Sequence, residues 1–323
     1  MRVRLSVQRV VVVPRNGYIN RLQATASASI IADQLGAEMA VCWLSQEAAP
    51  AARDTVFGSD SSLKFVSEPE LTEILGFGLE AFPHYVNSHV VSEVGRVVTF
   101  AGHERGEQPL MTQLAQELQS SDWEVLVILA GGRFSFEAGS QSNEWDSEMF
   151  RTARESWYQT LELAPEIENS VNSIPSEPFI GMHLRYSDRS HQAPSRSEIQ
   201  RAVVSKCQQL GLNRVFVASD SLKEREYWQK LLPTLGIFPW VLETENCSEH
   251  AGAQLALADW RVLGRSQSLV YFAKSSFGYE AAVASGKFTE SVALEPNKLV
   301  STGVQAKSLI ANVLSAPKRR GWF

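Results

Sequence analysis

The stretch FIGMHLRYSD, residues 179–188, opens with four apolar residues and then turns abruptly polar. The apolar part is typical of a buried strand, and the polar part places His183, Arg185 and Asp188 at the end of that strand. Ligands of open α/β sheets bind at the carboxyl ends of parallel strands, so the pattern predicts such a sheet and a ligand site at its edge. The guanidinium of Arg185 stays charged and matches phosphate oxygens, and His183 would share its face of the strand. We therefore expect the rest of the chain to build a site around Arg185.

Strands and helices alternate on both sides of this stretch, which favours an α/β fold with doubly wound parallel sheets. In the second half, strands are predicted at 214–218, 238–242 and 269–272, and helices at 197–210, 222–232, 249–263 and 279–284. In the first half, strands are predicted at 10–13, 39–44, 97–100 and 125–130, and helices at 21–35, 110–118 and 149–163. Much of 45–120 has no clear pattern. Prolines between 165 and 178 predict a linker, so we expect two domains, 1–173 and 174–323.

The composition excludes several classes of protein. The chain has 323 residues and a formal net charge of −6, without the basic footprint of a nucleic-acid binder. Its three cysteines, Cys42, Cys207 and Cys247, show no CxxC spacing, so neither a disulfide framework nor a cysteine metal site is expected. The apolar run Val10–Val13 is too short for a signal-peptide core, and no run reaches the roughly 18 apolar residues of a membrane span. These features predict a cytoplasmic protein without a transmembrane segment.

Polar residues follow three predicted strands of the second half. Arg185 and Asp188 follow the first, the pair Ser219 and Asp220 ends the second, and Ser275 with Ser276 follows the third, directly before a helix. Backbone N–H groups and hydroxyls at a helix N-terminus, with an arginine opposite, form a diphosphate site. Asp259, on the preceding helix, could accept two hydrogen bonds from guanine.

Each of these residues also has a structural interpretation. The two serine pairs and Asp220 could only cap helices, Asp188 could only hold its loop, and His183 could be a packed core histidine. Asp259 could form an ion pair. No paired carboxylates, nucleophile elbow or DxD-like metal motif appears, and the loop after the first strand lacks the glycine fingerprints of dinucleotide and P-loop sites. A mechanism without a metal, in which protein charges neutralise a departing phosphate, is favoured.

The stretch HLRYSD at 183–188 resembles the HxRxxD motif of the nodulation-type and protein O-fucosyltransferase superfamily. Three further segments resemble this family in the same order. They are NGYINRL at 16–22, similar to the family's Gly-Gly-x-Gly-Asn-Arg-Leu segment; FVASD at 216–220, similar to its strand ending in Thr/Ser-Asp; and Asp259 with KSSF at 274–277, similar to its Asp-x-x-x-Leu helix and Ser-Ser-Phe motif.

The resemblance implies a GT-B architecture, in which two Rossmann-like domains face each other across a cleft and the second holds the donor. It also implies an inverting, metal-independent transfer of fucose from GDP-fucose, or of a related hexose from its GDP-sugar, to a hydroxyl of a small glycoside or glycan. No cofactor besides the donor substrate is implied. The sequence does not give the acceptor, the exact sugar, the linkage or the oligomeric state.

Residue roles follow from the same resemblance. Arg185 would bind the diphosphate and help it leave, and Asp259 would read guanine. The remaining donor contacts would come from His183, Asp188, Ser219, Asp220, Ser275, Ser276 and Phe277. The acceptor side would carry Asn16, Gly17, Asn20 and Arg21.

The chain departs from the family pattern at several positions. Ile19 and Asn16 stand where the family has glycines, which would permit positive φ or a close backbone approach. Tyr186 and Arg189 replace a basic residue and a histidine. The sequence does not identify the base that would activate the acceptor hydroxyl, and Glu137 or Asp146 are only guesses for it. Three other hypotheses therefore stay open: a nucleotide-sugar-binding protein with a degenerate acceptor site, a glycosyltransferase that uses another NDP-sugar, and a Rossmann-type oxidoreductase.

Overall fold

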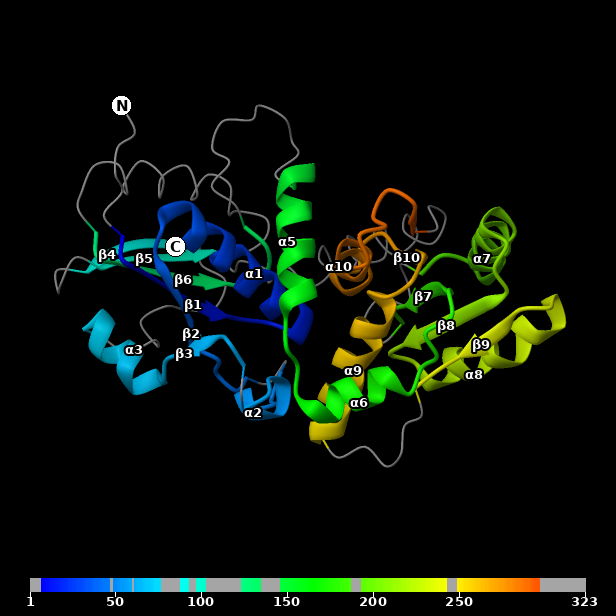
Figure 1. Cartoon of the computed structure of the whole chain (residues 1–323), viewed down its shortest axis with the longest axis horizontal. Coiled ribbons are helices and arrows are strands. Elements are labelled where there is room, and N and C mark those ends of the chain that lie inside the picture. Colours follow the sequence, from blue (N-terminus) through cyan, green and yellow to red (C-terminus); the bar gives the residue numbers. More distant parts are fainter. Residues whose placement is uncertain are drawn as a thin grey trace, which may run out of the picture. The chain divides into compact units, whose positions relative to one another are not determined.

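The computed structural model describes residues 7–46, 49–59, 61–76, 88–92, 97–102, 123–134, 146–186, 193–242 and 249–296, with the backbone alone given for 88–92, 97–102 and 249–251. These residues form two compact units (Figure 1). Unit 1 comprises Met1–Pro175, Leu242–Gly264 and Val283–Gly286. Unit 2 comprises Ser176–Val241, Arg265–Ala282 and Lys287–Phe323. Segment 242–264, which the sequence places in the second domain, thus belongs to unit 1.

Unit 1 is built on a six-stranded sheet with the order β3-β2-β1-β6-β5-β4. Its strands are β1 (Arg9–Pro14), β2 (Glu38–Val41), β3 (Lys64–Phe65), β4 (Ser88–Ser92), β5 (Val97–Gly102) and β6 (Val125–Ala130). All neighbouring pairs are parallel except β4, which runs antiparallel to β5 at the edge. The central strands β1 and β6 are continuous apolar runs, as expected for strands buried on both faces.

The helices of unit 1 are α1 (Tyr18–Leu35), α2 (Arg53–Val56), α3 (Glu68–Leu75), α5 (Glu148–Thr160), α6 (Pro165–Asn172) and α9 (Glu249–Leu263). Helix α1 packs on β1, β2 and β6 and ends at Gly36, whose φ of 67° is the left-handed conformation that glycine adopts without strain. Helix α9 comes from the second half of the chain and packs against α6, α2 and α1. Within unit 1, Trp260 of α9 makes an edge-to-face contact with Tyr158 of α5, with ring centroids 5.1 Å apart.

Two parts of unit 1 differ from the sequence-based expectation. The predicted linker after Pro165 begins with helix α6, because a proline at the first helical position loses no intrahelical hydrogen bond. Helix α3 was not predicted, although Ser67 and Glu70 form a capping box at its start. The strand expected at 97–100 is confirmed as β5, and the helix expected at 110–118 lies outside the described residues.

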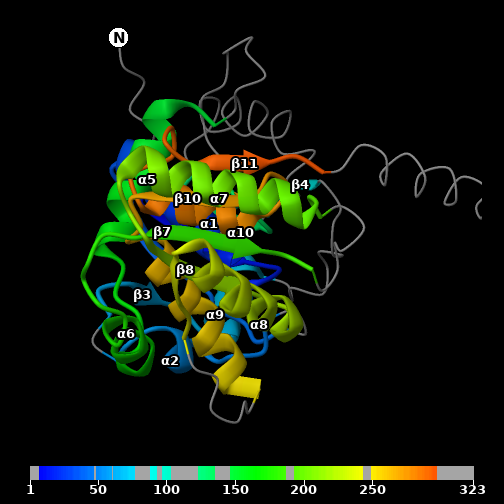
Figure 2. The same ribbon diagram turned by 90° about the vertical axis from the view of Figure 1, so that its right-hand side faces the viewer.

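Unit 2 is built on a five-stranded parallel sheet with the order β11-β10-β7-β8-β9. Its strands are β7 (Ile180–Leu184), β8 (Arg214–Ser219), β9 (Phe238–Trp240), β10 (Ser268–Phe272) and β11 (Val292–Leu294). Helices α7 (Arg196–Leu210) and α8 (Leu222–Leu231), the latter followed by the 3-10 helix Leu232–Leu235, lie in front of this sheet in Figure 2. Helix α10 (Ser276–Ala284) follows β10.

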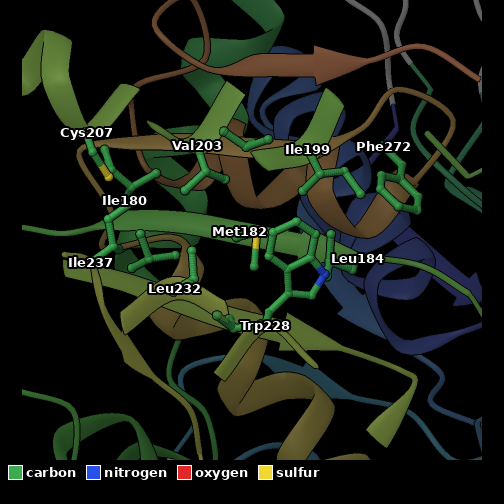
Figure 3. Close-up of a cluster of buried hydrophobic side chains, with 13 residues drawn as sticks. Ile180, Met182, Leu184, Ile199, Val203, Cys207, Trp228, Leu232, Ile237 and Phe272 are labelled. Carbon is green, nitrogen blue, oxygen red and sulfur yellow. The ribbon is translucent and has the colours of Figure 1, made fainter. Parts of the chain in front are cut away.

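Alternation along β7 separates the core of unit 2 from its site. Met182 and Leu184 point into an apolar cluster with Val203 of α7 and Trp228 of α8 (Figure 3). His183 lies between them in sequence and therefore faces the opposite side of the sheet. The expected fold class, α/β with doubly wound parallel sheets in two units, is confirmed. None of the helices within the described ranges combines the length and the apolar character needed to cross a membrane.

Candidate functional site

The carboxyl ends of three neighbouring strands of unit 2 bring several of the predicted donor residues to one edge. In the parallel register Leu184 pairs with Ser219, and His183 pairs with Tyr271 on the other side. The residues that follow β7, β8 and β10 therefore lie next to one another. A small hollow at this edge is lined by Arg185, Phe272, Ala273, Lys274, Ser275, Leu294 and Pro296.

Asp220 holds the end of β7 and the guanidinium that follows it. One carboxylate oxygen, Oδ1, accepts a hydrogen bond of 2.7 Å from the backbone N–H of Tyr186. The other, Oδ2, lies 3.8 Å from Nε of Arg185, and the two side chains are 28% and 36% exposed. Because this ion pair is long and partly hydrated, it orients the guanidinium while adding little stability. A phosphate oxygen can therefore approach Arg185 from the exposed side.

His183 is packed and uncharged. Its ring stacks on that of Phe277, with centroids 4.5 Å apart and planes inclined by 15°, and its Nδ1 lies 3.5 Å from Oγ of Ser275. Burial lowers the pKa of His183 to about 3; the carboxylate of Asp220 opposes this shift and Arg185 adds to it. A neutral imidazole supplies no positive charge to a diphosphate, so His183 acts here as a support for the loop that carries Ser275 and Phe277.

The start of α10 is fixed by its own hydrogen bonds and by a close contact. Oγ of Ser275 accepts a hydrogen bond from the N–H of Gly278, and the N–H of Ser275 donates to the carbonyl of Phe272 at 2.8 Å. A Cβ atom at Gly278 would lie 2.6 Å from Cβ of Tyr271, so the helix reaches this distance from β10 only with glycine. Ser276 is the first residue of the helix, so the N-terminus of α10 directly follows Ser275, which lines the same hollow as Arg185.

Ser219 has a structural role in the connection from β8 to α8. Its Oγ accepts a hydrogen bond of 3.1 Å from the N–H of Ser221, and its carbonyl accepts one of 3.0 Å from Arg225. Ser221 in turn caps α8 by accepting from the N–H of Glu224. Ser219 as a residue is only 9% exposed, and its hydroxyl takes part in a hydrogen bond within the protein.

The loop after β1 in unit 1 carries the predicted acceptor residues. Asn16 has a φ of 68°, the left-handed conformation that glycine and, less often, asparagine adopt. Its Nδ2 donates a 3.0 Å hydrogen bond to the carbonyl of Gly131, which ties the ends of β1 and β6 together. Gly17 is the N-cap residue of α1, and Asn20 is half-buried in its first turn.

Arg21, another of the predicted acceptor-side residues, is fully buried. Its Nε and Nη1 donate to the carbonyls of Asn16 and Leu44, at 3.0 and 2.6 Å, and its guanidinium lies 4.8 Å from the ring centroid of Trp43. Burial lowers the pKa of Arg21 to about 10. A guanidinium held by backbone carbonyls and an indole ring braces the loop after β1, and its role on the acceptor side stays a prediction.

The described geometry does not test two further donor candidates. Asp259 is buried on α9, with 5% of its surface exposed, and α9 belongs to unit 1. Asp188 lies outside the described residues. The guanine-reading role of Asp259 and the role of Asp188 therefore stay predictions.

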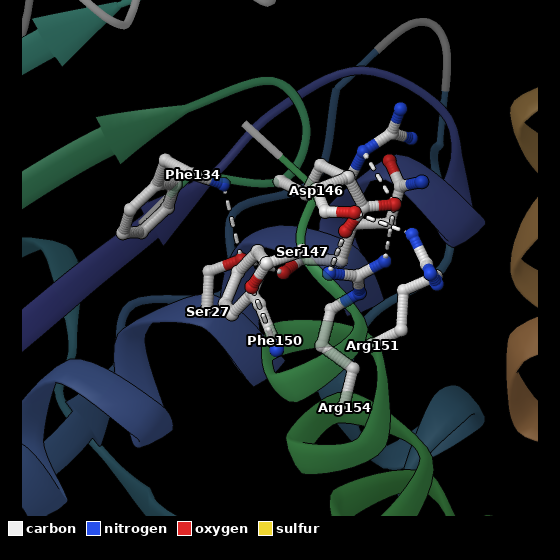
Figure 4. A network of polar contacts seen from close by, with 9 residues as sticks. Ser27, Phe134, Asp146, Ser147, Phe150, Arg151 and Arg154 are labelled. Atoms are coloured by element: carbon white, nitrogen blue, oxygen red, sulfur yellow. Dashed lines mark hydrogen bonds and ion pairs between the residues drawn. The ribbon is translucent and has the colours of Figure 1, made fainter. Parts of the chain in front are cut away.

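Asp146, one of the two guesses for a base, is the centre of a buried ion pair (Figure 4). Its two carboxylate oxygens accept hydrogen bonds of 2.7 and 3.2 Å from Arg154, whose side chain is fully buried. Nε of Arg133 lies 3.7 Å from Oδ2 of Asp146, and Nη1 of Arg151 donates a hydrogen bond to the backbone carbonyl of Asp146. A carboxylate surrounded by guanidiniums is stabilised as the anion and is a poor proton acceptor. Glu137 lies outside the described residues.

Within the described ranges, no group of three or more histidines, cysteines, aspartates or glutamates is placed to hold a metal ion.

Comparison with solved structures identifies proteins of the same fold. NodZ α-1,6-fucosyltransferase soaked with GDP-fucose is similar with a TM-score of 0.55 at 16% sequence identity, over 86% of this chain and 92% of that one. A variant of Arabidopsis thaliana FUT1 in complex with GDP gives 0.59 at 16% identity, over 87% and 69%. POFUT1 in complex with GDP-fucose gives 0.50 at 14% identity, over 89% and 96%. The chain has the fucosyltransferase fold, which confirms the expected GT-B class with two Rossmann-like units.

The likeness is carried by structure. No known family's sequence profile matches the chain, and no curated protein matches it by sequence. The resemblance to fucosyltransferases that the motifs indicate is therefore confirmed at the level of the fold. One lysine at the Arg185 edge, Lys274, belongs to the quoted KSSF segment but was not predicted as a site residue, because its position toward the hollow depends on the turn after β10.

Proposed function

We propose that this protein is a glycosyltransferase that moves fucose, or a related hexose, from a GDP-sugar to a hydroxyl of a small glycoside or glycan. The observation that carries the proposal is the position of Arg185 beside the N-terminus of α10, at the edge of a fold shared with fucosyltransferases that were crystallised with GDP or GDP-fucose. An arginine and a helix N-terminus together favour a diphosphate.

The proposed chemistry is a single displacement at the anomeric carbon with inversion. The acceptor oxygen forms a bond to that carbon while the bond from the carbon to the β-phosphate oxygen breaks, and GDP leaves with the electron pair. The acceptor proton passes to a base that the described residues do not identify. Arg185 and the start of α10 stabilise the negative charge that develops on the leaving oxygen. No metal ion has a part in this proposal, and a cytoplasmic location stays a prediction.

Thermal stability with a panel of nucleotides tests the donor. GDP, UDP, ADP, dTDP and NAD are each added with and without EDTA, and a ligand at about 100 times its dissociation constant stabilises by about 2.7 kcal/mol. We expect a melting shift that is selective for GDP and insensitive to EDTA. A shift with UDP or dTDP instead would point to another NDP-sugar, and a shift with NAD alone would favour the oxidoreductase.

Transfer assays then separate an enzyme from a binding protein. Arg185→Ala is compared with Arg214→Ala, which removes an arginine at the start of β8, at the opposite end of the strands. Loss of a charge-assisted phosphate contact costs about 2–5 kcal/mol, so Arg185→Ala should lose most transfer while Arg214→Ala keeps it. If the wild type binds the donor but neither transfers its sugar nor hydrolyses it, the sugar-nucleotide-binding alternative is supported.

A further inference from the structure

We propose that Lys274 is a second phosphate-binding cation of the donor site and acts together with Arg185. The inference rests on the proposed function and adds to it a residue that takes up the charge of the leaving group. It starts from the hollow at the carboxyl edge of unit 2, where Lys274, Arg185 and Ser275 line the same space.

The backbone on both sides of Lys274 is held in place. The N–H of Ala273 donates a 2.9 Å hydrogen bond to the carbonyl of Leu294, and the N–H of Ser275 donates one of 2.8 Å to the carbonyl of Phe272. The first bond ties the turn to β11 and the second closes it onto the end of β10. The Cα atom of Lys274 is therefore fixed at the rim of the hollow, and only its flexible side chain has to move to meet a ligand.

The charges around the hollow give this lysine its importance. Each phosphate of a sugar nucleotide carries a negative charge, and the diphosphate gains another as the bond to the sugar breaks. Arg185 faces that charge with Asp220 only 3.8 Å from its Nε, so part of its positive potential is already compensated. His183 is neutral because its burial lowers its pKa to about 3. Lys274 adds a second positive charge at the rim of the same hollow.

The chemistry of a lysine suits the moving group. An ammonium is a compact charge on a flexible stem and binds phosphate as a point charge, whereas a guanidinium binds it through a fixed planar fork. Arg185 is oriented by Asp220 and by the end of β7, so it defines where the diphosphate sits. Lys274 can follow the terminal phosphate as it departs. We therefore assign the β-phosphate to Lys274.

The test compares GDP with GMP, which lacks the β-phosphate. Dissociation constants are measured by isothermal titration calorimetry for the wild type, Lys274→Met, Lys274→Arg and Lys230→Met, the last removing an exposed lysine from the far end of α8. We expect Lys274→Met to weaken GDP about 10-fold to 100-fold, the range for a hydrogen bond to a charged group, while GMP changes less than about twofold. Lys274→Arg should keep most of the affinity, and Lys230→Met all of it.

The outcomes separate this inference from the function on which it rests. An unchanged preference for GDP over GMP in Lys274→Met would overturn the role of Lys274 and leave the glycosyltransferase proposal standing. Equal weakening of both nucleotides would overturn it too, since that result indicates general damage to the site. A wild-type protein that binds neither nucleotide would overturn both proposals.

Discussion

The approach of helix α10 to strand β10 depends on Gly278, and Gly278→Ala tests whether that approach builds the donor site. The added Cβ would lie 2.6 Å from Cβ of Tyr271 and 3.0 Å from two of its ring carbons. The clash involves a Cβ, which no side-chain rotation can move, so the helix or the strand must shift. Overpacking of this kind costs about 1–3 kcal/mol.

A helical glycine in open space gives the matched control. Gly252 lies in α9, and a Cβ there would meet no atom within 4 Å. Gly252→Ala should raise the free energy of unfolding by up to about 1 kcal/mol, the gain in helix propensity. Gly278→Ala has the same gain, which the clash with Tyr271 offsets or exceeds, so the two variants should differ by about 1–3 kcal/mol.

Thermal melts and GDP titrations measure the two consequences. For units of this size, 1 kcal/mol corresponds to about 2–4 °C in melting temperature. Gly278→Ala should also bind GDP more weakly than the wild type, because Ser275 and Phe277 move with the start of α10. Gly252→Ala should bind it normally. If Gly278→Ala were stabilised as much as Gly252→Ala and bound GDP with unchanged affinity, the reasoning would be refuted.

Three other predictions concern charges. His183 has a folded-state pKa of about 3, below its ordinary value of about 6.5, so the folded protein loses stability as the pH falls from about 6.5 toward 3. In this pH range His183 contributes up to about 1.4 kcal/mol per pH unit to the change in unfolding free energy, and urea unfolding of His183→Gln should show that this contribution is lost. Asp146→Asn removes the charge that faces buried Arg154 and should lower the free energy of unfolding by about 3–5 kcal/mol; normal stability with abolished transfer would instead mark Asp146 as the base. Asp220→Asn keeps an acceptor for the backbone N–H of Tyr186 but no longer orients the Arg185 guanidinium through its charge. Steady-state kinetics should therefore show a lower kcat with GDP affinity changed by no more than about 1 kcal/mol, whereas a large loss of both would indicate a structural role.

The strands that carry the site were predictable because burial on both faces leaves a continuous apolar run. Strands β1, β6, β7, β8 and β10 all have this signature. Two helix ends were predictable for a second reason, since Gly36 and Gly211 take φ values of 67° and 65° that favour glycine. Parallel strand ends share one edge, so the gathering of Arg185, Asp220 and Ser275 followed from the order of elements alone.

Features that depend on contacts distant in sequence were not predictable. The burial of Arg21 is one of them, since its guanidinium donates to the carbonyls of Asn16 and Leu44, and Leu44 lies 23 residues further along the chain. The neutral state of His183 depends on burial beneath Phe277, which a sequence pattern does not report. The association of α9 with unit 1 likewise depends on packing against α6, α2 and α1, and no local sequence pattern in α9 indicates these partners.

The return of α9 to unit 1 has a consequence for biosynthesis. During translation, the strands of the unit 1 sheet and strands β7, β8 and β9 of unit 2 are synthesised before α9. Until α9 is made, the surfaces of α2 and α6 that it covers in the folded protein stay exposed. Tyr158 then lacks the ring of Trp260. A fragment that ends at Pro175 would lack α9 and would therefore be an incomplete unit 1. A chimera that combines unit 1 of this protein with unit 2 of another must include α9 as well as the N-terminal half.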